Sequence, residues 1–170
     1  VDNIFNSDDQ VSVTEMQTEL AELRSQLAAI HHFQIVAEYT MNGTIIKANE
    51  NFLNLMGYNL NELEGQNISM LLDLAYRYSA HNAAFWGRLN DGESISGKFK
   101  RIAKGVKTVW VQAIYCPFLD SSGKPFKVVE YAVDVTQQVQ LERALTSMVE
   151  EVQEVATAVK NNNLTQRISL

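Results

Sequence analysis

Three short turn sequences divide the middle of this 170-residue chain and limit the folds it can adopt. Asn42-Gly43, Lys104-Gly105 and Asp120-Ser121-Ser122-Gly123 each lie between two apolar segments. Asn-Gly is the strongest short hairpin signal, because both central residues of a type I′ turn need positive φ. The turns predict five strands, which in chain order are residues 33–40, 44–48, 94–103, 108–119 and 125–135.

The segment between the second and third predicted strands is expected to be helical. Residues 49–92 have few β-branched runs, and Gly57 and Gly65 punctuate them. Gly57 is expected to end the first helix in the left-handed conformation, and the longest helix is predicted over residues 75–89. The order of two strands, helices and three strands predicts an α+β fold, in which a five-stranded antiparallel sheet carries a helical connection over one face.

Both ends of the chain carry an apolar stripe with alternating steps of three and four residues, the spacing of a coiled-coil seam. The stripes consist of Val13, Met16, Leu20, Leu23, Leu27 and Ile30, and of Leu141, Leu145, Met148, Val152, Val155 and Val159. Ser12 and Glu15 predict a capping box at the start of the first helix. Such narrow stripes favour a homodimer through both helices, and packing against the chain's own domain is the alternative.

Composition and charge restrict the class of protein. The net charge of −6, the pI near 5.0 and the scattered Lys and Arg residues argue against nucleic acid as a partner. One cysteine, Cys116, excludes an intrachain disulfide, and no apolar run approaches the ~20 residues that cross a bilayer. We therefore expect a soluble, cytoplasmic segment. Because the sequence starts at Val1 without an initiator Met or a signal peptide, we expect it to be excised from a longer protein, which can be attached to a membrane.

Several of these segments together resemble the PAS domain family over residues 33–136. The residues that carry the resemblance are Asn42-Gly43-Thr44-Ile45, Ala48-Asn49, Phe52, Gly57-Tyr58, Gly65 and Asp134-Val135-Thr136. The last three are similar to the Asp-Ile-Thr motif with which PAS domains join a signalling helix. The polar, acidic composition of residues 1–10 predicts a disordered N-terminus, and the apolar stripe that follows predicts an amphipathic helix over 11–32. The resemblance implies a sensor domain over 33–136, a signalling helix over 137–160 and a HAMP-like connector from 161 to 170.

Further runs are similar to PAS domains of methyl-accepting chemotaxis proteins of the aerotaxis type. They are Ala84-Phe85-Trp86, Lys100-Arg101-Ile102, Val109-Trp110-Val111-Gln112-Ala113 and Lys127-Val128-Val129-Glu130-Tyr131-Ala132. The tail Asn163-Leu164-Thr165-Gln166-Arg167-Ile168 resembles a HAMP connector, although Asn162-Asn163 stands where Gly-Asp is usual. This resemblance implies a sensor of a gas, a redox state or a small ligand, coupled to a HAMP or receptor signalling domain of the same chain. The alternatives are a cofactor-free dimerisation and relay module, or the sensor of a kinase or cyclase.

The resemblance to haem-binding PAS domains of oxygen-sensing kinases implies a cofactor site. His81 then holds the iron of haem b, and Trp110, Tyr115 and Arg101 line the gas side of the pocket. FAD is the alternative cofactor, with Trp86 and Trp110 stacking on its ring. A protein without a cofactor, in which His81 is a plain surface residue, is a third interpretation.

Light-driven flavin chemistry and catalysis are both disfavoured by the residues present. Gly65-Gln66-Asn67-Ile68 lacks the cysteine that bonds flavin in light-sensing relatives. The chain has no Gly-x-Ser-x-Gly, no phosphate-binding glycine loop and no His-Glu-x-x-His, so we expect no enzyme. His31 and His32 end the first predicted helix, where the helix dipole favours a cation, and no metal site is predicted there.

The exit of the domain carries the predicted signal relay. Asp134 is expected to pair with Lys104 or Lys107 of the neighbouring hairpin, and Thr136 to cap the outgoing helix. A change in the core would then reach that helix through the last strand.

Overall fold

The computed structural model describes the backbone of residues 7–168 and the side chains of residues 12–160. Its order of elements is two strands, a series of short helices and three strands between two long helices. In chain order they are α1 (Ser7–Phe33), β1 (Ile35–Tyr39), β2 (Ile45–Ala48), α2 (Glu50–Met56), α3 (Leu60–Leu63), η1 (Ile68–Leu71), α4 (Leu74–Arg77), α5 (Ala80–Asn90), β3 (Ile95–Ile102), η2 (Lys104–Val106), β4 (Thr108–Leu119), β5 (Pro125–Asp134) and α6 (Thr136–Ile168).

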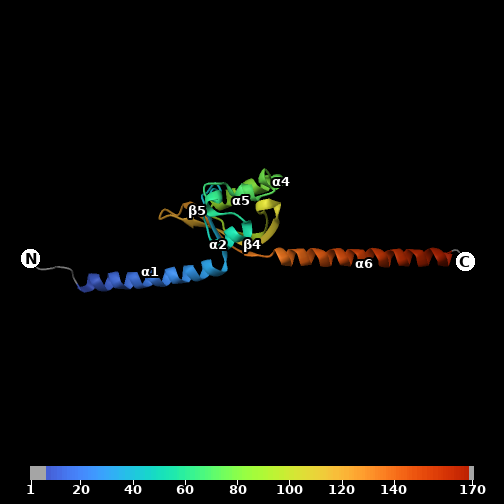
Figure 1. Cartoon of the computed structure of the whole chain (residues 1–170), viewed down its shortest axis with the longest axis horizontal. Helices are drawn as coiled ribbons and strands as arrows, with labels where there is room; N and C mark the ends of the chain where they lie inside the picture. The colour runs from blue at the N-terminus through green and yellow to red at the C-terminus, as the bar shows by residue number, and fades with distance from the viewer. Residues whose placement is uncertain (1–6, 169–170) are drawn as a thin grey trace, which may run out of the picture.

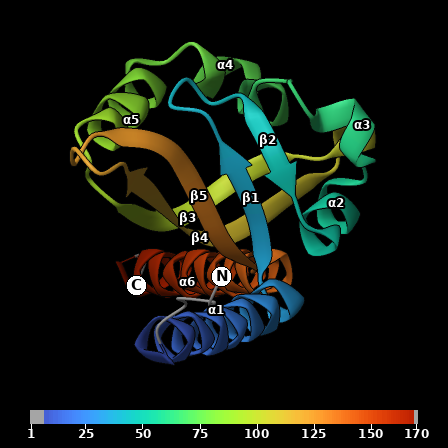
Figure 2. The same ribbon diagram turned by 90° about the vertical axis from the view of Figure 1, so that its left-hand side faces the viewer.

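The five strands form one antiparallel sheet in the order β2-β1-β5-β4-β3. Because side chains alternate along a strand, each strand presents one set to the helical connection and the other set to the opposite face. Helices α2 to α5 cover the first face, whereas α1 and α6 lie below the second (Figure 2). The predicted α+β fold with a helical connection over one face is confirmed.

Two glycines at predicted turns have the backbone conformation that the sequence requires. Gly43 has φ +85° in the β1–β2 hairpin, and a Cβ there would lie 2.8 Å from Cζ2 of Trp86. Gly57 has φ +72° and donates its backbone N–H to the Leu53 carbonyl at 2.8 Å, which ends α2. Gly43 therefore serves both the turn and the close approach of α5.

The long helix predicted over residues 75–89 is wrong, because the chain breaks between α4 and α5. Ser79 is the N-cap of α5, and its Oγ accepts a hydrogen bond from the Asn82 N–H at 3.2 Å. A serine at this position stabilises a new helix start and competes with continuation of the preceding one. His81 is consequently the second residue of α5 and not a mid-helix residue.

The helix ends also differ from the predicted limits. Helix α1 begins at Ser7, so the predicted disorder of residues 7–10 and the capping box at Ser12 are wrong, while residues 1–6 lie outside the described residues. Helix α6 runs to Ile168 without a break at residue 161, where the HAMP-like connector is predicted to start. Residues 169–170 of that connector lie outside the described range.

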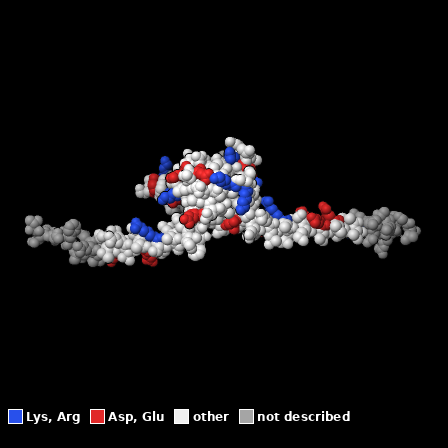
Figure 3. Space-filling model, in the orientation of Figure 1, with Lys and Arg blue, Asp and Glu red and all other residues white. Residues whose placement is uncertain are grey.

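The two long helices leave the core in opposite directions (Figure 1). Every residue of both apolar stripes is at least 42% exposed, so the stripes do not pack against the chain's own domain. No helix within residues 7–168 is long and apolar enough to cross a membrane. Charges of both signs are interspersed on the face of the core that Figure 3 shows.

Candidate functional site

A chain of buried polar side chains crosses the helix-covered face of the sheet. Tyr39 on β1 and Tyr115 on β4 both donate their hydroxyl hydrogens to Glu130 on β5. Arg101 on β3 donates from a terminal nitrogen to the Tyr115 hydroxyl. All four side chains are at most 4% exposed. The chain therefore links a buried cation to a buried carboxylate through a tyrosine.

Burial determines how these groups titrate. Desolvation raises the pKa of Tyr39 well above its usual value, and the neighbouring Glu130 raises it further. Desolvation likewise raises the pKa of Tyr115, which Arg101 partly offsets. Burial alone would lower the pKa of Arg101, but Tyr115 and Glu130 outweigh it and raise that pKa. Both tyrosines are thus neutral at physiological pH, and Arg101 is charged.

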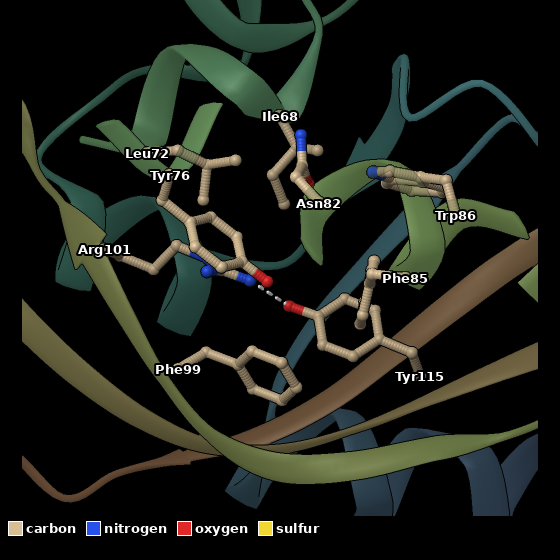
Figure 4. A pocket seen from close by; sticks show the side chains of 9 residues that line it. All are labelled: Ile68, Leu72, Tyr76, Asn82, Phe85, Trp86, Phe99, Arg101 and Tyr115. Atoms are coloured by element: carbon tan, nitrogen blue, oxygen red, sulfur yellow. Dashed lines mark hydrogen bonds between the residues drawn. The ribbon is translucent and has the colours of Figure 1, made fainter. Parts of the chain in front are cut away.

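A small pocket lies between Arg101 and the helices above the sheet (Figure 4). Arg101 and Tyr115 point toward each other at its base, and edge-to-face contacts of Phe85 with Phe99 and Tyr115 fill one side. The cavity has a volume of about 10 Å³, which is the space of one water molecule. Its lining consists of Ile68, Leu72, Tyr76, Asn82, Phe85, Trp86, Phe99, Arg101 and Tyr115.

Three of the five predicted cofactor residues, Trp86, Arg101 and Tyr115, line this pocket. The other two do not. His81 is exposed near the start of α5, and Trp110 lies on the opposite face of the sheet from Tyr115. The expectation that Trp110 and Tyr115 line one pocket is wrong, because residues an odd number apart on a strand face opposite sides.

The residues around this pocket do not fit haem or FAD. Among the described residues that line it there is no histidine, cysteine or methionine to hold a haem iron. The volume of one water molecule admits neither a porphyrin nor an isoalloxazine ring unless the core opens. Haem b and FAD stay predictions.

A second cluster joins the sheet to α6. Thr136 Oγ1 accepts a hydrogen bond from the Trp110 N–H of β4 at 2.9 Å, and Val135 N–H donates to the Trp110 carbonyl at 2.9 Å. Asp134 Oδ1 accepts from the Thr136 N–H at 2.8 Å, which satisfies a free donor at the start of α6. Asp134 therefore caps α6, whereas the Thr136 side chain ties the helix to β4.

The first turns of α6 pack on the second face of the sheet. Val139 is 7% exposed, and the Arg143 guanidinium carbon lies 4.9 Å from the centre of the Trp110 ring. Lys98 of β3 forms an ion pair with Glu142 at 3.2 Å. Strands β3 and β4 thus hold the pocket on one face and α6 on the other.

A match to a known family covers the whole sheet and its helical connection. The family model described as "PAS domain" matches residues 34–137, which is more than half of the chain. The chain belongs to the PAS domain family. The match begins before β1 and ends just inside α6, so both the pocket and the Asp134–Thr136 junction belong to the PAS domain.

Known proteins similar to this PAS chain include one close relative in sequence. The biofilm dispersion protein BdlA of Pseudomonas aeruginosa is 37% identical over 117 residues, which are 69% of this chain and 28% of that protein. Among solved structures, an RNA-binding light-oxygen-voltage receptor has a TM-score of 0.63 at 20% identity, covering 79% of this chain and 39% of that one. A PAS domain of Colwellia psychrerythraea has a TM-score of 0.59 at 19% identity, covering 68% and 98%. These two structures show the fold.

The predicted partners of Asp134 lie elsewhere in the PAS domain. Lys104 forms an ion pair with Glu62 at 2.6 Å and lies over the Tyr58 ring, 5.3 Å from its centre. Lys107 is exposed at the end of the hairpin. The prediction that Asp134 pairs with either lysine is therefore wrong, because the Thr136 N–H is the nearer donor in sequence and in space.

Two asparagines at the start of α2 also attach α1 to the PAS domain. Asn49 caps α2, since its Oδ1 accepts from the Phe52 N–H at 3.0 Å. Its Nδ2 donates to the carbonyls of His31 at 2.9 Å and Gln34 at 2.7 Å, just where α1 ends. Asn51 donates to the carbonyls of His32 and Gln34 in the same way. These amides satisfy carbonyls that a helix end leaves free, a role that sequence reasoning missed.

Proposed function

We propose that this PAS domain is the sensory module of a chemotaxis-type receptor, which detects a small ligand in the Arg101 pocket and relays the event to α6. The observation that carries the proposal is that strand β4 contacts the pocket with one face and α6 with the other. Tyr115 faces the pocket, whereas Trp110 on the other face holds Thr136 and Arg143 of α6. A displacement of β4 by a ligand acts on both ends at once, because packed strands move as units.

The module acts by biasing a helix pair between two arrangements, and we infer no catalytic step. The chemotaxis assignment rests on the resemblance of the strand sequences and of the tail at residues 163–168. The named relative is a biofilm dispersion protein, and the matched region spans 28% of its length. We propose that the output domain, HAMP-like at its start, follows α6 in the same polypeptide at the cytoplasmic side.

Hydrogen exchange tests the coupling from the pocket to α6. Tyr115→Phe removes the hydroxyl that joins Arg101 to Glu130 and keeps the ring. We expect amide exchange over residues 136–143 to change by about tenfold, which is the effect of losing one buried hydrogen bond on local opening. The control is Tyr78→Phe, because Tyr78 is 80% exposed. Native exchange over residues 136–143 in Tyr115→Phe would contradict the coupling.

We further propose that the exposed stripes of α1 and α6 pair with those of a second copy, in parallel. In the heptad of α1, Val13, Leu20 and Leu27 take position a, so Glu19 takes position g and Arg24 position e. In a parallel pair, position g of one helix faces position e of the next heptad on the other. Glu19 then faces Arg24 of the second copy, twice by symmetry.

The flanks of the α6 stripe support the same pairing. With Leu145 and Val152 at position a, the flanking positions e and g are mostly small or apolar, and they include Ala144, Val149 and Ala156. Helices can approach closely along such a flank. The two helices leave the core in opposite directions, so one parallel axis serves both pairs (Figure 1).

The mass of the protein in solution tests this homodimer. Leu20→Asp combined with Leu145→Asp places charges in both seams, and we expect sedimentation to give the 19.1 kDa mass of one chain. The matched control is Thr18→Asp with Ser147→Asp, which adds the same charges at outward positions and should leave the dimer. A dimer that survives in the seam variant, at native helix content, would show that another surface holds the copies together.

The second candidate is a cofactor-free relay, in which the signal enters through α1. The Asn49 and Asn51 contacts to the end of α1, together with the nearly filled core, favour it. In a relay of this kind, Tyr115→Phe leaves the exchange of residues 136–143 unchanged while Asn49→Ala alters it. The same measurement therefore separates the two functions.

A further inference from the structure

We propose that the Arg101 pocket binds a small planar oxyanion, of the carboxylate or nitrate type, as the ligand of this PAS domain. The inference rests on the proposed sensory function and names the class of molecule sensed. Three observations carry it: the bonding of the guanidinium, the position of the nearest carboxylate and the shape of the pocket.

The guanidinium of Arg101 is buried with part of its bonding capacity unused. One terminal nitrogen donates to the Tyr115 hydroxyl and the other to the Lys100 carbonyl at 3.1 Å. The Nε–H is buried, and among the described residues none accepts a hydrogen bond from it. A buried donor that lacks an acceptor is costly, so a ligand oxygen at this point gains the free energy that the folded chain alone does not recover.

No carboxylate of the described residues lies within ion-pair distance of Arg101. The buried Glu130 acts on it through the Tyr115 hydroxyl. Buried arginines are normally satisfied by a carboxylate in direct, often bidentate contact. An incoming oxyanion supplies that direct contact and Glu130 does not.

Only a small anion fits here, and the pocket must widen to admit it. Its volume is that of about one water molecule, which is less than the volume of formate or nitrate, and Phe85 and Phe99 close it on the apolar side. The guanidinium carbon lies 5.3 Å from the centre of the Phe99 ring, in a cation–π contact. The Tyr76 side chain from α4 reaches the same space (Figure 4). Tyr76 is 37% exposed, which gives the anion a side chain to displace on entry.

Calorimetric titration at constant ionic strength tests the proposal, with sodium formate, acetate, nitrate and nitrite against sodium chloride and neutral acetamide. We expect one or more of the oxyanions to bind one per chain with a dissociation constant of about 1 mM or tighter, and chloride and acetamide to bind at least about tenfold more weakly. The relative affinities of the carboxylates and the inorganic oxyanions show which of the two kinds of anion is the ligand. Saturable binding by none of the four would overturn the proposal.

Variants locate the site. Arg101→Lys keeps the charge but loses the planar donor edge, and we expect a loss of affinity of about tenfold or more. Glu130→Gln removes the competing carboxylate and should raise the affinity several-fold. The matched control is Lys107→Gln, an exposed cation outside the pocket, which should bind within twofold of the native protein. Equal loss in Lys107→Gln and Arg101→Lys would show surface binding and overturn the assignment.

A single substitution of Arg101 leaves Glu130 as an unpaired buried charge, so loss of binding in that variant could reflect loss of folding. Arg101→Gln combined with Glu130→Gln removes both buried charges and avoids this problem. This double variant should fold and should bind none of the four oxyanions, whereas retained binding would contradict the site. The proposed relay is measured without any ligand, by exchange in α6. A failed titration therefore leaves that test of the proposed function intact.

Discussion

Arg101→Gln is expected to lower the free energy of unfolding by about 3–5 kcal/mol. The substitution leaves Glu130 buried with two tyrosine donors but without the cation at the other end of the chain. Glu130 is 1% exposed, so its carboxylate has no access to water in place of Arg101. Glu130→Gln should destabilise for the converse reason, since it leaves the guanidinium uncompensated. Denaturant unfolding at neutral pH measures both losses.

A double-mutant cycle separates this pairing from the loss of two side chains. If Arg101 and Glu130 stabilise each other through Tyr115, the double variant Arg101→Gln with Glu130→Gln loses clearly less than the sum of the single losses. The control is Arg88→Gln, because the Arg88–Glu93 ion pair is about half exposed on both sides and should change stability by at most about 0.5 kcal/mol. Strictly additive losses would contradict the linked chain of four residues.

Stability should fall steeply at alkaline pH. The folded-state pKa values of Tyr39 and Tyr115 are raised well above the usual 10.0, chiefly by burial. Between the unfolded and folded pKa values, the folded protein keeps two tyrosine protons that the unfolded chain has released. The contribution of these protons to the free energy of unfolding is therefore complete below pH 10 and is lost as the pH rises above it. With two such groups, the free energy of unfolding falls by up to about 2.7 kcal/mol for each pH unit in this range.

Tyrosine-to-phenylalanine variants show which residues cause this fall of the free energy of unfolding with pH. Tyr39→Phe and Tyr115→Phe should each reduce it by about half relative to their own stability at neutral pH. Tyr78→Phe, at an exposed position, should leave the slope unchanged. Denaturant unfolding between pH 8 and pH 11 makes the comparison, and an unaltered slope in the Tyr39→Phe, Tyr115→Phe double variant would assign the alkaline loss to other groups.

The sheet could be predicted from the sequence because its signals are local. Asn42-Gly43 needs positive φ, Gly57 ends a helix in the left-handed conformation, and each acts within a few residues. The break at Ser79 was missed although its signal is equally local, since a serine followed by a helical run is a plausible N-cap. No glycine or proline lies between Ala75 and Trp86 to mark the break.

The candidate site was harder to predict because it depends on which face of the sheet each residue occupies. Strand alternation alone places Trp110 and Tyr115 on opposite faces, and it places Glu130 with Val128 and Ala132 on the inner one. That a carboxylate lies inside an apolar strand was the available signal for Glu130. Its pairing with Tyr39 joins positions 91 residues apart, and only the register of β1 with β5 brings them together.

The exit junction shows a different limit. The Asp134-Val135-Thr136 motif identifies where β5 ends and α6 begins, but it does not predict which residues hydrogen-bond to Asp134 and Thr136. The contacts of Thr136 with Trp110 on β4 depend on the β4–β5 register, in which Val111 pairs with Asp134. The prediction that a lysine pairs with Asp134 rested on opposite charge alone. The start of a helix also offers free backbone N–H donors, and these lie next to Asp134 in the sequence.

The most direct test of the link between pocket and output helix is the distance between the two α6 helices of the dimer. Spin labels at Ser147→Cys, in a Cys116→Ser background, report that distance from an outward position of the helix. With Tyr115→Phe in the pocket, we expect the mean distance to shift by about 1–2 Å or more, the usual size of a helix displacement in signalling, while Tyr78→Phe gives the native distance. An identical distance distribution in all three proteins would contradict a relay from the Arg101 pocket to α6.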